Sequence, residues 1–321
     1  MKLNLTFISL SRRKKYCLAS VYSVFLILLL VYLYIYEFIY VISEGDIISN
    51  LVPIDYSHLG NACPLSRIEV TNSLSSCSVS NKDSAYRVTK SDIVGGEWQP
   101  KHCTSRFLVA IIVPYRAREE NLHKFMSFMH PFIQKQNIHY KMYVIEQSKH
   151  KEFNRGKLFN IGFLEALKEK SFPCFIFHDV DLLPENPNNI YACTRTPRHL
   201  SAAIDKFEYR TPYYRNFGGA LSILVDQFRQ VNGFSNEFYG WGGEDDNFYN
   251  RLRHALIRPV RFDYSISRYC ALPHEQEKPN ENRHYLLKVS SNYVLEGLNS
   301  TKYTVIQRSD DPLFEKILVD L

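Results

Sequence analysis

The chain has 321 residues, of which 45% are hydrophobic and 22% charged, and this is enough for one large globular domain or two small ones. Its net charge is a modest +6, with no basic tract beyond the N-terminus. These values support a packed core and argue against nucleic acid as a partner.

The N-terminal region predicts a membrane anchor. Residues 16–36 carry no charge, and at about 1.5 Å per residue a helix of this length crosses a hydrocarbon core of roughly 30 Å. Basic residues at positions 12–15 precede the segment and acidic residues follow it, so residues 1–15 are predicted to be cytosolic and the rest to lie across the membrane. A cleaved signal peptide is the alternative, but its apolar part would be shorter and would end at a small-residue cleavage site. We therefore expect a stem over residues 37–60 and a lumenal catalytic domain over residues 61–321.

The cysteines and one sequon agree with a lumenal location. Six cysteines follow the apolar segment: Cys63, Cys77, Cys103, Cys174, Cys193 and Cys270. An even number permits disulfides without fixing their pairing. Asn299 begins an Asn-Ser-Thr sequon, which is usable only in the lumen.

From residue 107 onward, predicted strands alternate with predicted helices. Residues 107–113 are a short apolar run rich in β-branched side chains, residues 118–135 look helical, and residues 141–147 are typical of a second strand. Residues 155–169 have a helical period, and residues 174–181 are an apolar strand that runs into carboxylates. This alternation predicts an α/β domain with a largely parallel sheet.

The last of these strands ends in His178-Asp179-Val180-Asp181. In open α/β sheets, ligands bind beyond the carboxyl ends of the strands. Two carboxylates one residue apart can there address one polar group and one metal, and a divalent cation on a carboxylate neutralises the diphosphate of a departing nucleotide. A solvated pair of acids in a turn is the alternative, and the apolar strand before the pair favours the metal site.

A second constellation, Gly-Trp-Gly-Gly-Glu-Asp-Asp over residues 240–246, is more specific. Glycine lets a ligand approach the backbone closely, and Trp241 offers a plate for the apolar face of a sugar ring. Glu244, Asp245 and Asp246 repel one another unless they are solvated or functional. An acidic helix start stabilised by the helix dipole explains the acids but not a tryptophan between glycines.

Several basic side chains have the charge to bind a nucleotide diphosphate. Arg116 and Arg118 follow the first strand, and Arg155 and Lys157 lie near a predicted helix start, where anions bind well. Each could equally belong to a surface charge cluster. In the polar loop of residues 274–284, His274 is a candidate metal ligand.

These motifs together resemble the β-1,4-galactosyltransferases, a family of Golgi type II membrane proteins with a GT-A fold, which has a Rossmann-like, mixed and mainly parallel sheet flanked by helices. The resemblance runs from about Cys63 to the C-terminus. It rests on the ordered segments VAIIVPYRAREENL, FNRGKLFNIGF, FHDVDLLPEN, PRHLSAAIDKF, NFGGALSI, NGFSNEFYGWGGEDDNFYNRL and GLNS. It implies an enzyme that moves galactose or N-acetylgalactosamine from UDP-Gal or UDP-GalNAc to a GlcNAc-terminated glycoprotein or glycolipid, with its catalytic domain in the Golgi lumen.

The resemblance also implies roles for individual residues. Those that match the donor-binding set are Pro114, Tyr115, Arg116, Arg118, Phe153, Arg155, Asp179, Val180, Lys206, Asn216 and Trp241. Those that match the acceptor-binding and catalytic set are Gly243, Glu244, Asp245, Asp246 and Arg283, with Asp245 as the base that takes the proton of the attacking hydroxyl. Asp181 and His274 match the manganese ligands. The implied disulfides are Cys63–Cys103 and Cys174–Cys193, which leaves Cys77 and Cys270 unpaired or paired differently.

Two positions depart from the family pattern. The family completes its metal site with a Cys-x-Met-x-x-His segment, whereas here His274 comes one residue earlier after Cys270 and no methionine is present, so a third protein ligand is not identified. Asn216 stands where galactose-specific members have tyrosine, and the smaller side chain is expected to admit UDP-GalNAc. The weakened metal site motivates an alternative, a lectin-like glycan-binding protein on the same fold, and a metal-dependent phosphohydrolase is a third possibility.

Overall fold

The structure is a computed structural model that describes residues 20–31, 40–54, 61–64, 92–289 and 293–321. It divides into two compact units, Met1–Phe38 and Ile39–Leu321. In the first unit, residues 20–31 form a helix. Within the described ranges, no helix combines the length and the apolarity needed to cross a membrane. Residues 16–19 and 32–36 of the predicted anchor lie outside those ranges, so the anchor stays a prediction.

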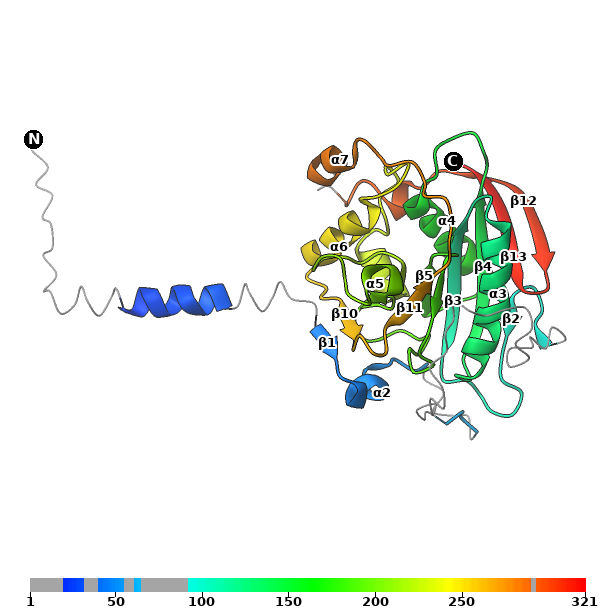
Figure 1. The fold of residues 1–321 in the computed structure, drawn as a ribbon, viewed down its shortest axis with the longest axis horizontal. Helices are drawn as coiled ribbons and strands as arrows, with labels where there is room; N and C mark the ends of the chain where they lie inside the picture. The colour runs from blue at the N-terminus through cyan, green and yellow to red at the C-terminus, as the bar shows by residue number, and fades with distance from the viewer. Residues whose placement is uncertain (1–19, 32–39, 55–60, 65–91, 290–292) are drawn as a thin grey trace, which may run out of the picture. The chain divides into compact units, whose positions relative to one another are not determined.

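The second unit is built on a ten-stranded mixed sheet (Figure 1). The strand order is β1-β10-β7-β9-β5-β3-β4-β13-β12, and β2 also pairs with β4. Neighbours are parallel from β5 through β3 and β4 to β13 and along β1-β10-β7, but antiparallel around β9, at β2 and in the β12–β13 hairpin. The bounds are β1 Tyr40–Ile42, β2 Glu97–Trp98, β3 Leu108–Tyr115, β4 His139–Gln147, β5 Cys174–His178, β7 Arg198–His199, β9 Ala220–Leu224, β10 Val260–Phe262, β12 Thr304–Asp311 and β13 Phe314–Asp320.

A smaller sheet and the helices complete the unit. The smaller sheet has the order β6-β11-β8, with β6 at Leu182–Pro184, β8 at Ala203–Ile204 and β11 at Arg268–Ala271. The helices are α2 Ile47–Asn50, α3 Glu119–Gln134, α4 Arg155–Glu169, α5 Val225–Gln230, α6 Glu244–His254 and α7 Arg283–Val289, and the 3-10 turns are η1 Glu44–Asp46, η5 Asp205–Phe207 and η6 Leu298–Ser300. The strands and helices predicted between residues 107 and 181 are all present, so the prediction of a mixed α/β domain is confirmed.

The alternating side chains of β3 explain why the unit has two apolar cores. Val109, Ile111 and Val113 belong to the core that includes the apolar face of α3, whereas Ala110 and Ile112 belong to the core that includes α4. Alternation follows from the pleat, because successive side chains point to opposite faces. Both faces are covered by helices, which is why the central strands are unbroken apolar runs in the sequence.

The segment before residue 64 contributes to the second unit. β1 adds to the sheet through β10, and Ile42, Ile47 and Leu51 are buried, so part of the range predicted as a stem is packed on this unit. The two expected disulfides, Cys63–Cys103 and Cys174–Cys193, are present. Cys270 is disulfide-bonded as well, which removes the possibility that it is unpaired, and Cys77 lies outside the described residues.

Candidate active site

The turn after β5 places two aspartates at the carboxyl edge of the sheet. β5 ends at His178, and the N–H of Asp179 donates to the carbonyl of Gly219 (3.2 Å). Asp181 is buried, and its carbonyl accepts from the N–H of Leu272, which follows β11 (2.7 Å). Backbone groups from two distant segments therefore fix the position of this turn.

Arg155, the first residue of α4, joins this turn to α6. Its guanidinium donates to Asp179 Oδ1 (2.5 Å), to the carbonyl of Gly219 (3.1 Å) and to Glu244 Oε1 (3.2 Å). It also lies over the ring of Phe159, with 4.7 Å from Cζ to the ring centroid. Arg155 thus holds a carboxylate of the β5 turn and a carboxylate of α6 in one largely buried cluster.

Three acids begin α6. Gly243 precedes the helix with a φ of +99°, and a Cβ there would come within 2.8 Å of the Phe238 ring, so the position requires glycine. Glu244 is buried, and its Oε2 has no hydrogen-bond partner among the described residues. Burial, reinforced by Asp245, raises the pKa of Glu244 to about 7. A carboxyl group that keeps its proton near neutral pH can donate a hydrogen bond as well as accept one.

Asp245 and Asp246 are more exposed than Glu244. Asp245 lies against Gly218, where a Cβ would stand 2.5 Å from Asp245 Oδ2. Asp246 Oδ1 accepts a hydrogen bond from the hydroxyl of Tyr213 (2.9 Å), and burial together with Asp245 raises the pKa of Asp246 to about 6. Glu244 and Asp246 therefore have specific partners and raised pKa values, which a solvated acidic helix start would not give them.

Asp181 meets His274 on the other side of the β5 turn. Asp181 Oδ2 lies 2.9 Å from His274 Nδ1 and 3.8 Å from Arg118 Nη1. A carboxylate and an imidazole in contact are suitable donors for manganese, and the remaining positions can come from substrate phosphates and water. No cluster of three or more His, Cys, Asp or Glu side chains fit for a metal occurs in the described part of the chain. The pair therefore fits a cation that binds together with a phosphate-bearing substrate.

The loop after His274 covers the arginines that follow β3. Arg116 lies over the ring of Phe153 (5.2 Å to the centroid), and its guanidinium donates to Glu277 Oε1 (2.8 Å). Arg118 donates to the carbonyl of Glu275 (3.2 Å). Backbone and side-chain oxygens of the loop thus occupy donors that the sequence assigns to a nucleotide diphosphate.

The same loop reaches Trp241. The N–H of Trp241 donates to the carbonyl of Lys278 (2.8 Å), and its carbonyl accepts from the N–H of Asn280 (3.0 Å). The guanidinium of Arg283 lies over the half-exposed indole, 5.8 Å from Cζ to the ring centroid. Residues 274–283 therefore connect the Asp181–His274 pair to the tryptophan beside the acids.

Comparison with known proteins agrees with this arrangement. The model for the N-terminal region of glycosyl transferase group 7 matches residues 63–194, and that for the N-terminal domain of galactosyltransferase matches residues 198–275. Mouse β-1,4-galactosyltransferase 2 is 42% identical over 236 residues, which are 71% of this chain and 63% of that protein. The chain belongs to the β-1,4-galactosyltransferase family.

Two further comparisons place the chain within this family. Mouse β-1,4-galactosyltransferase 6 is 43% identical over 229 residues, 70% of this chain and 57% of that protein, so the chain matches less than two thirds of the length of these relatives. A solved structure of a mutant Drosophila β-1,4-galactosyltransferase 7, in complex with manganese, UDP-Gal and xylobiose, is 26% identical with a TM-score of 0.58, and the match covers 67% of this chain and 94% of that one. The fold is therefore the GT-A type of this family, and the lectin-like alternative gains no support.

Other residues assigned by the family resemblance lie around the same turn. Lys206, in η5, is an electrostatic neighbour of both Asp179 and Asp181, and Val180 is buried between these aspartates in the chain. The carbonyl of Asn216 accepts from Arg261 Nη2 (2.6 Å). The N–H of Asn216 donates to the carbonyl of Tyr213 (3.1 Å), whose hydroxyl contacts Asp246, which puts this departure from the family pattern near the acids.

Four residues lie where the sequence did not suggest. Arg155 binds carboxylates of the protein itself, although its place at a helix start had suggested a bound anion. Lys157 is buried, and its electrostatic neighbours are Lys151, Glu237 and Asp320. None of these three neighbours belongs to the Arg155 cluster or to the Asp181–His274 pair, so Lys157 lies apart from the site. Buried Pro114 and Tyr115 form the end of β3, one residue pair beyond the predicted strand.

Two contact residues of the site were not singled out from the sequence. Tyr213 and Glu277 contact Asp246 and Arg116, respectively. Glu277 lies in a loop that was recognised as polar, but the loop carries several charged residues and its pattern does not indicate which one faces Arg116. Tyr213 precedes the glycine pair by only a few residues, and nothing local points to its partner 33 positions away.

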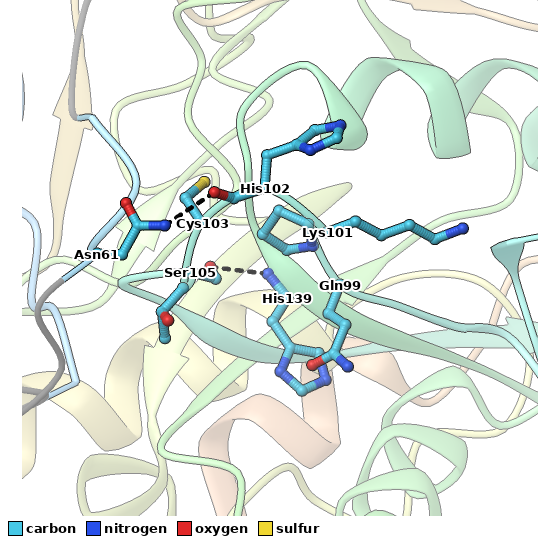
Figure 2. Close-up of a pocket in the computed structure, with 9 residues that line it drawn as sticks. Asn61, Gln99, Lys101, His102, Cys103, Ser105 and His139 are labelled. Carbon is cyan, nitrogen blue, oxygen red and sulfur yellow. Dashed lines mark hydrogen bonds between the residues drawn. The ribbon is translucent and has the colours of Figure 1, made fainter.

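A separate hollow of about 450 Å³ lies elsewhere on the unit (Figure 2). It is lined mainly by polar residues near the starts of β3 and β4, among them Asn61, Lys101, His102 and His139. Of the residues to which the sequence gave a role, only Cys103, which forms the disulfide with Cys63, lines this hollow. We therefore place the candidate site at the opposite, carboxyl ends of these strands, where the acids and arginines gather.

Proposed function

We propose that the protein is an inverting β-1,4-glycosyltransferase that moves galactose from UDP-Gal to a GlcNAc-terminated glycan. The observation that carries this proposal is the Arg155 cluster, which ties the β5 turn to the acids of α6. The residues proposed to bind the donor and those proposed to bind the acceptor would thereby share one site. The solved relative in complex with UDP-Gal and xylobiose supports the same pairing of a nucleotide sugar with a glycan.

Asp245 is the proposed general base. It follows Glu244 at the start of α6 and stands against the backbone of Gly218, so no side chain at that position separates it from the β9 side of the site. A carboxylate there would take the proton of the acceptor hydroxyl as the hydroxyl attacks C1 of the donor sugar. Asp246, fixed by Tyr213, and Glu244, fixed by Arg155, would orient the acceptor through hydrogen bonds.

Asp181 and His274 are the proposed holders of a manganese ion. When bound, such an ion would neutralise charge on the departing diphosphate. Arg116, Arg118 and Lys206 would bind the diphosphate from the protein side, and Arg116 must first exchange Glu277 for the donor.

Donor choice and cellular location complete the proposal. Asn216 is proposed to admit UDP-GalNAc in addition to UDP-Gal, because its side chain is smaller than the family's tyrosine and carries an amide that can bond to an acetamide. The uncharged segment 16–36 is proposed to anchor the protein in the Golgi membrane, with Asn299 glycosylated in the lumen.

A donor-by-acceptor matrix with a metal series tests the proposal on the full chain. We expect transfer from UDP-Gal to GlcNAc-terminated acceptors with manganese, and loss of roughly 10²–10⁴-fold in kcat for Asp245→Asn. Unchanged transfer by Asp245→Asn would remove the assigned base. Hydrolysis of UDP-Gal at a rate that is independent of the acceptor would indicate a phosphohydrolase, and strong rejection of UDP-GalNAc would refute the role given to Asn216.

A further inference from the structure

Two buried basic side chains, Arg261 and His199, lie side by side on β10 and β7. The two strands are parallel with Arg261 as the register partner of His199, so both side chains project from the same face of the sheet. Arg261 is 3% exposed and His199 is fully buried. His199 also pairs with Leu221 of β9, which belongs to the core that includes Phe248 of α6. The pair therefore faces the layer that carries the acids of the candidate site.

Arg261 is a buried cation whose contacts are uncharged groups. Its Nη2 donates to the carbonyls of Asn216 (2.6 Å) and Tyr214 (3.2 Å), and its Nε donates to His199 Nδ1 (3.3 Å). Burial lowers the pKa of Arg261, and its main electrostatic neighbours are tyrosines rather than carboxylates. The guanidinium is thus placed to gather backbone carbonyls, for which its fixed fork of donors is suited, and not to neutralise an acid.

His199 extends this hold to a third carbonyl. A guanidinium only donates hydrogen bonds, so Nδ1 of His199 accepts from Arg261, and Nε2 carries the proton and donates to the carbonyl of Gly218 (2.8 Å). Burial, reinforced by the charge of Arg261, holds the pKa of His199 well below its ordinary value, so the ring stays neutral. Its ring also packs on Phe217, with 5.3 Å between the centroids. The pair thus binds every second carbonyl of residues 214–218.

Residues 214–218 carry two groups of the candidate site. Asn216 is the position proposed to select the donor sugar. Gly218 stands against the proposed base, because a Cβ there would lie 2.5 Å from Asp245 Oδ2. Between them Phe217 is buried, and its ring centroid lies 6.3 Å from that of an aromatic ring in α6. A shift of this segment would therefore move the donor-selecting side chain relative to the proposed base.

A second buried arginine next to His199 holds a different segment. Arg198 is fully buried, donates to Asn189 Oδ1 (2.9 Å) and to the carbonyl of Ala192 (3.1 Å), and lies over the ring of Phe262 (3.9 Å to the centroid). Successive residues of a strand point to opposite faces, so Arg198 projects away from the face that α6 covers. The two arginines share their burial and their uncharged partners, and they differ in the segment that each one holds.

We propose that Arg261 is a positioning residue that, together with His199, fixes residues 214–218 and thereby sets how the donor sugar meets Asn216. This inference rests on the proposed glycosyltransferase function and adds a determinant of donor choice that does not itself touch the donor. With three carbonyls held, the backbone at Asn216 is ordered before binding. The side-chain amide can then meet the acetamide of UDP-GalNAc without a further cost of ordering.

A comparison of Arg261→Met with the matched variant Arg198→Met tests the proposal on the full chain. Each change removes a buried guanidinium and keeps an apolar side chain, so both variants should have a lower Tm. Only Arg261→Met should lower kcat/KM for UDP-GalNAc relative to UDP-Gal, by about fivefold, which is the weight of one neutral hydrogen bond. Losses common to both donors cancel in this ratio. Arg261→Lys, which keeps the charge and can reach one carbonyl, should give a smaller shift, and it takes the place of Arg261→Met if that variant does not fold.

Hydrogen–deuterium exchange measures the hold on the segment separately from activity. Arg261→Met should speed exchange at residues 214–218, whereas Arg198→Met should speed it at residues 189–192 instead. Unchanged exchange at residues 214–218 in Arg261→Met would overturn the positioning role. Faster exchange with an unchanged donor ratio would overturn the role in donor choice, and so would rejection of UDP-GalNAc by the wild type. A wild type that transfers neither sugar would refute the glycosyltransferase function and with it the role in donor choice, while faster exchange would still establish the hold on the segment.

Discussion

Replacing Arg155 with methionine leaves two carboxylates without their cation. Arg155 is largely buried and donates to Asp179 at 2.5 Å and to Glu244 at 3.2 Å. Methionine keeps the apolar contact with Phe159 but removes the positive charge. Asp179 and Glu244 then either remain charged in a poorly solvated site or take up protons, and both outcomes cost free energy.

The magnitude follows from the burial of the pair. Removing one partner of a buried ion pair costs about 3–5 kcal/mol. For a domain of this size each kcal/mol lowers Tm by roughly 2–4 °C, so Tm should fall by roughly 6–20 °C. The same substitution at Arg229, an exposed residue 3.9 Å from an exposed Asp226, should cost less than about 0.5 kcal/mol.

Thermal unfolding and equilibrium binding of UDP together decide between two roles for Arg155. If the residue positions the two acids, Arg155→Met lowers Tm strongly while the Kd for UDP, which lacks the sugar, changes little. If it is a phosphate ligand, as its place at a helix start suggested, the Kd rises at least tenfold and Tm stays within the range of the Arg229→Met control. The second result would refute the role as a positioning residue.

Three further predictions concern Glu244, Glu277 and Gly243. Burial raises the pKa of Glu244 to about 7 from an ordinary 4.5. Between these two pH values the folded protein keeps a proton that the unfolded chain has lost. The contribution of Glu244 to the free energy of unfolding therefore falls by up to about 1.4 kcal/mol per pH unit as the pH rises from 4.5 to 7. Urea unfolding at pH 5, 6 and 7 should show a shallower fall for Glu244→Gln, and parallel curves would contradict the assignment. Glu277→Gln should lower the KM for UDP-Gal about two- to fivefold by releasing Arg116, and a higher KM would show that the loop carboxylate assists donor binding. Gly243→Ala should destabilise the protein by about 1–3 kcal/mol because of its φ of +99° and the nearby Phe238 ring. The control Gly45→Ala, whose Cβ would meet nothing closer than 3.7 Å, should not destabilise it. Equal losses of stability in the two variants would exclude strain at the start of α6.

The local pattern of the sequence determined the elements that carry the site. The apolar runs around residues 107–113, 141–147 and 174–181 became three neighbouring strands of the sheet, and α4 covers residues 155–169 as predicted. These signals are local, because a buried strand needs consecutive apolar residues and a helix repeats its apolar face every three to four residues. The two aspartates after β5 and the acids that begin α6 were placed at element ends for the same reason.

Only the tertiary structure decided which charged groups meet. Arg155 finds carboxylates 24 and 89 positions away, and Arg116 finds one 161 positions away. No periodicity carries that information, because a contact between distant segments depends on how the sheet orders its strands and where the loop after β11 crosses the site. The sequence by itself therefore determined the residue types and the elements that bear them, whereas the fold decided that an arginine suited to an anion binds the acids of the protein itself.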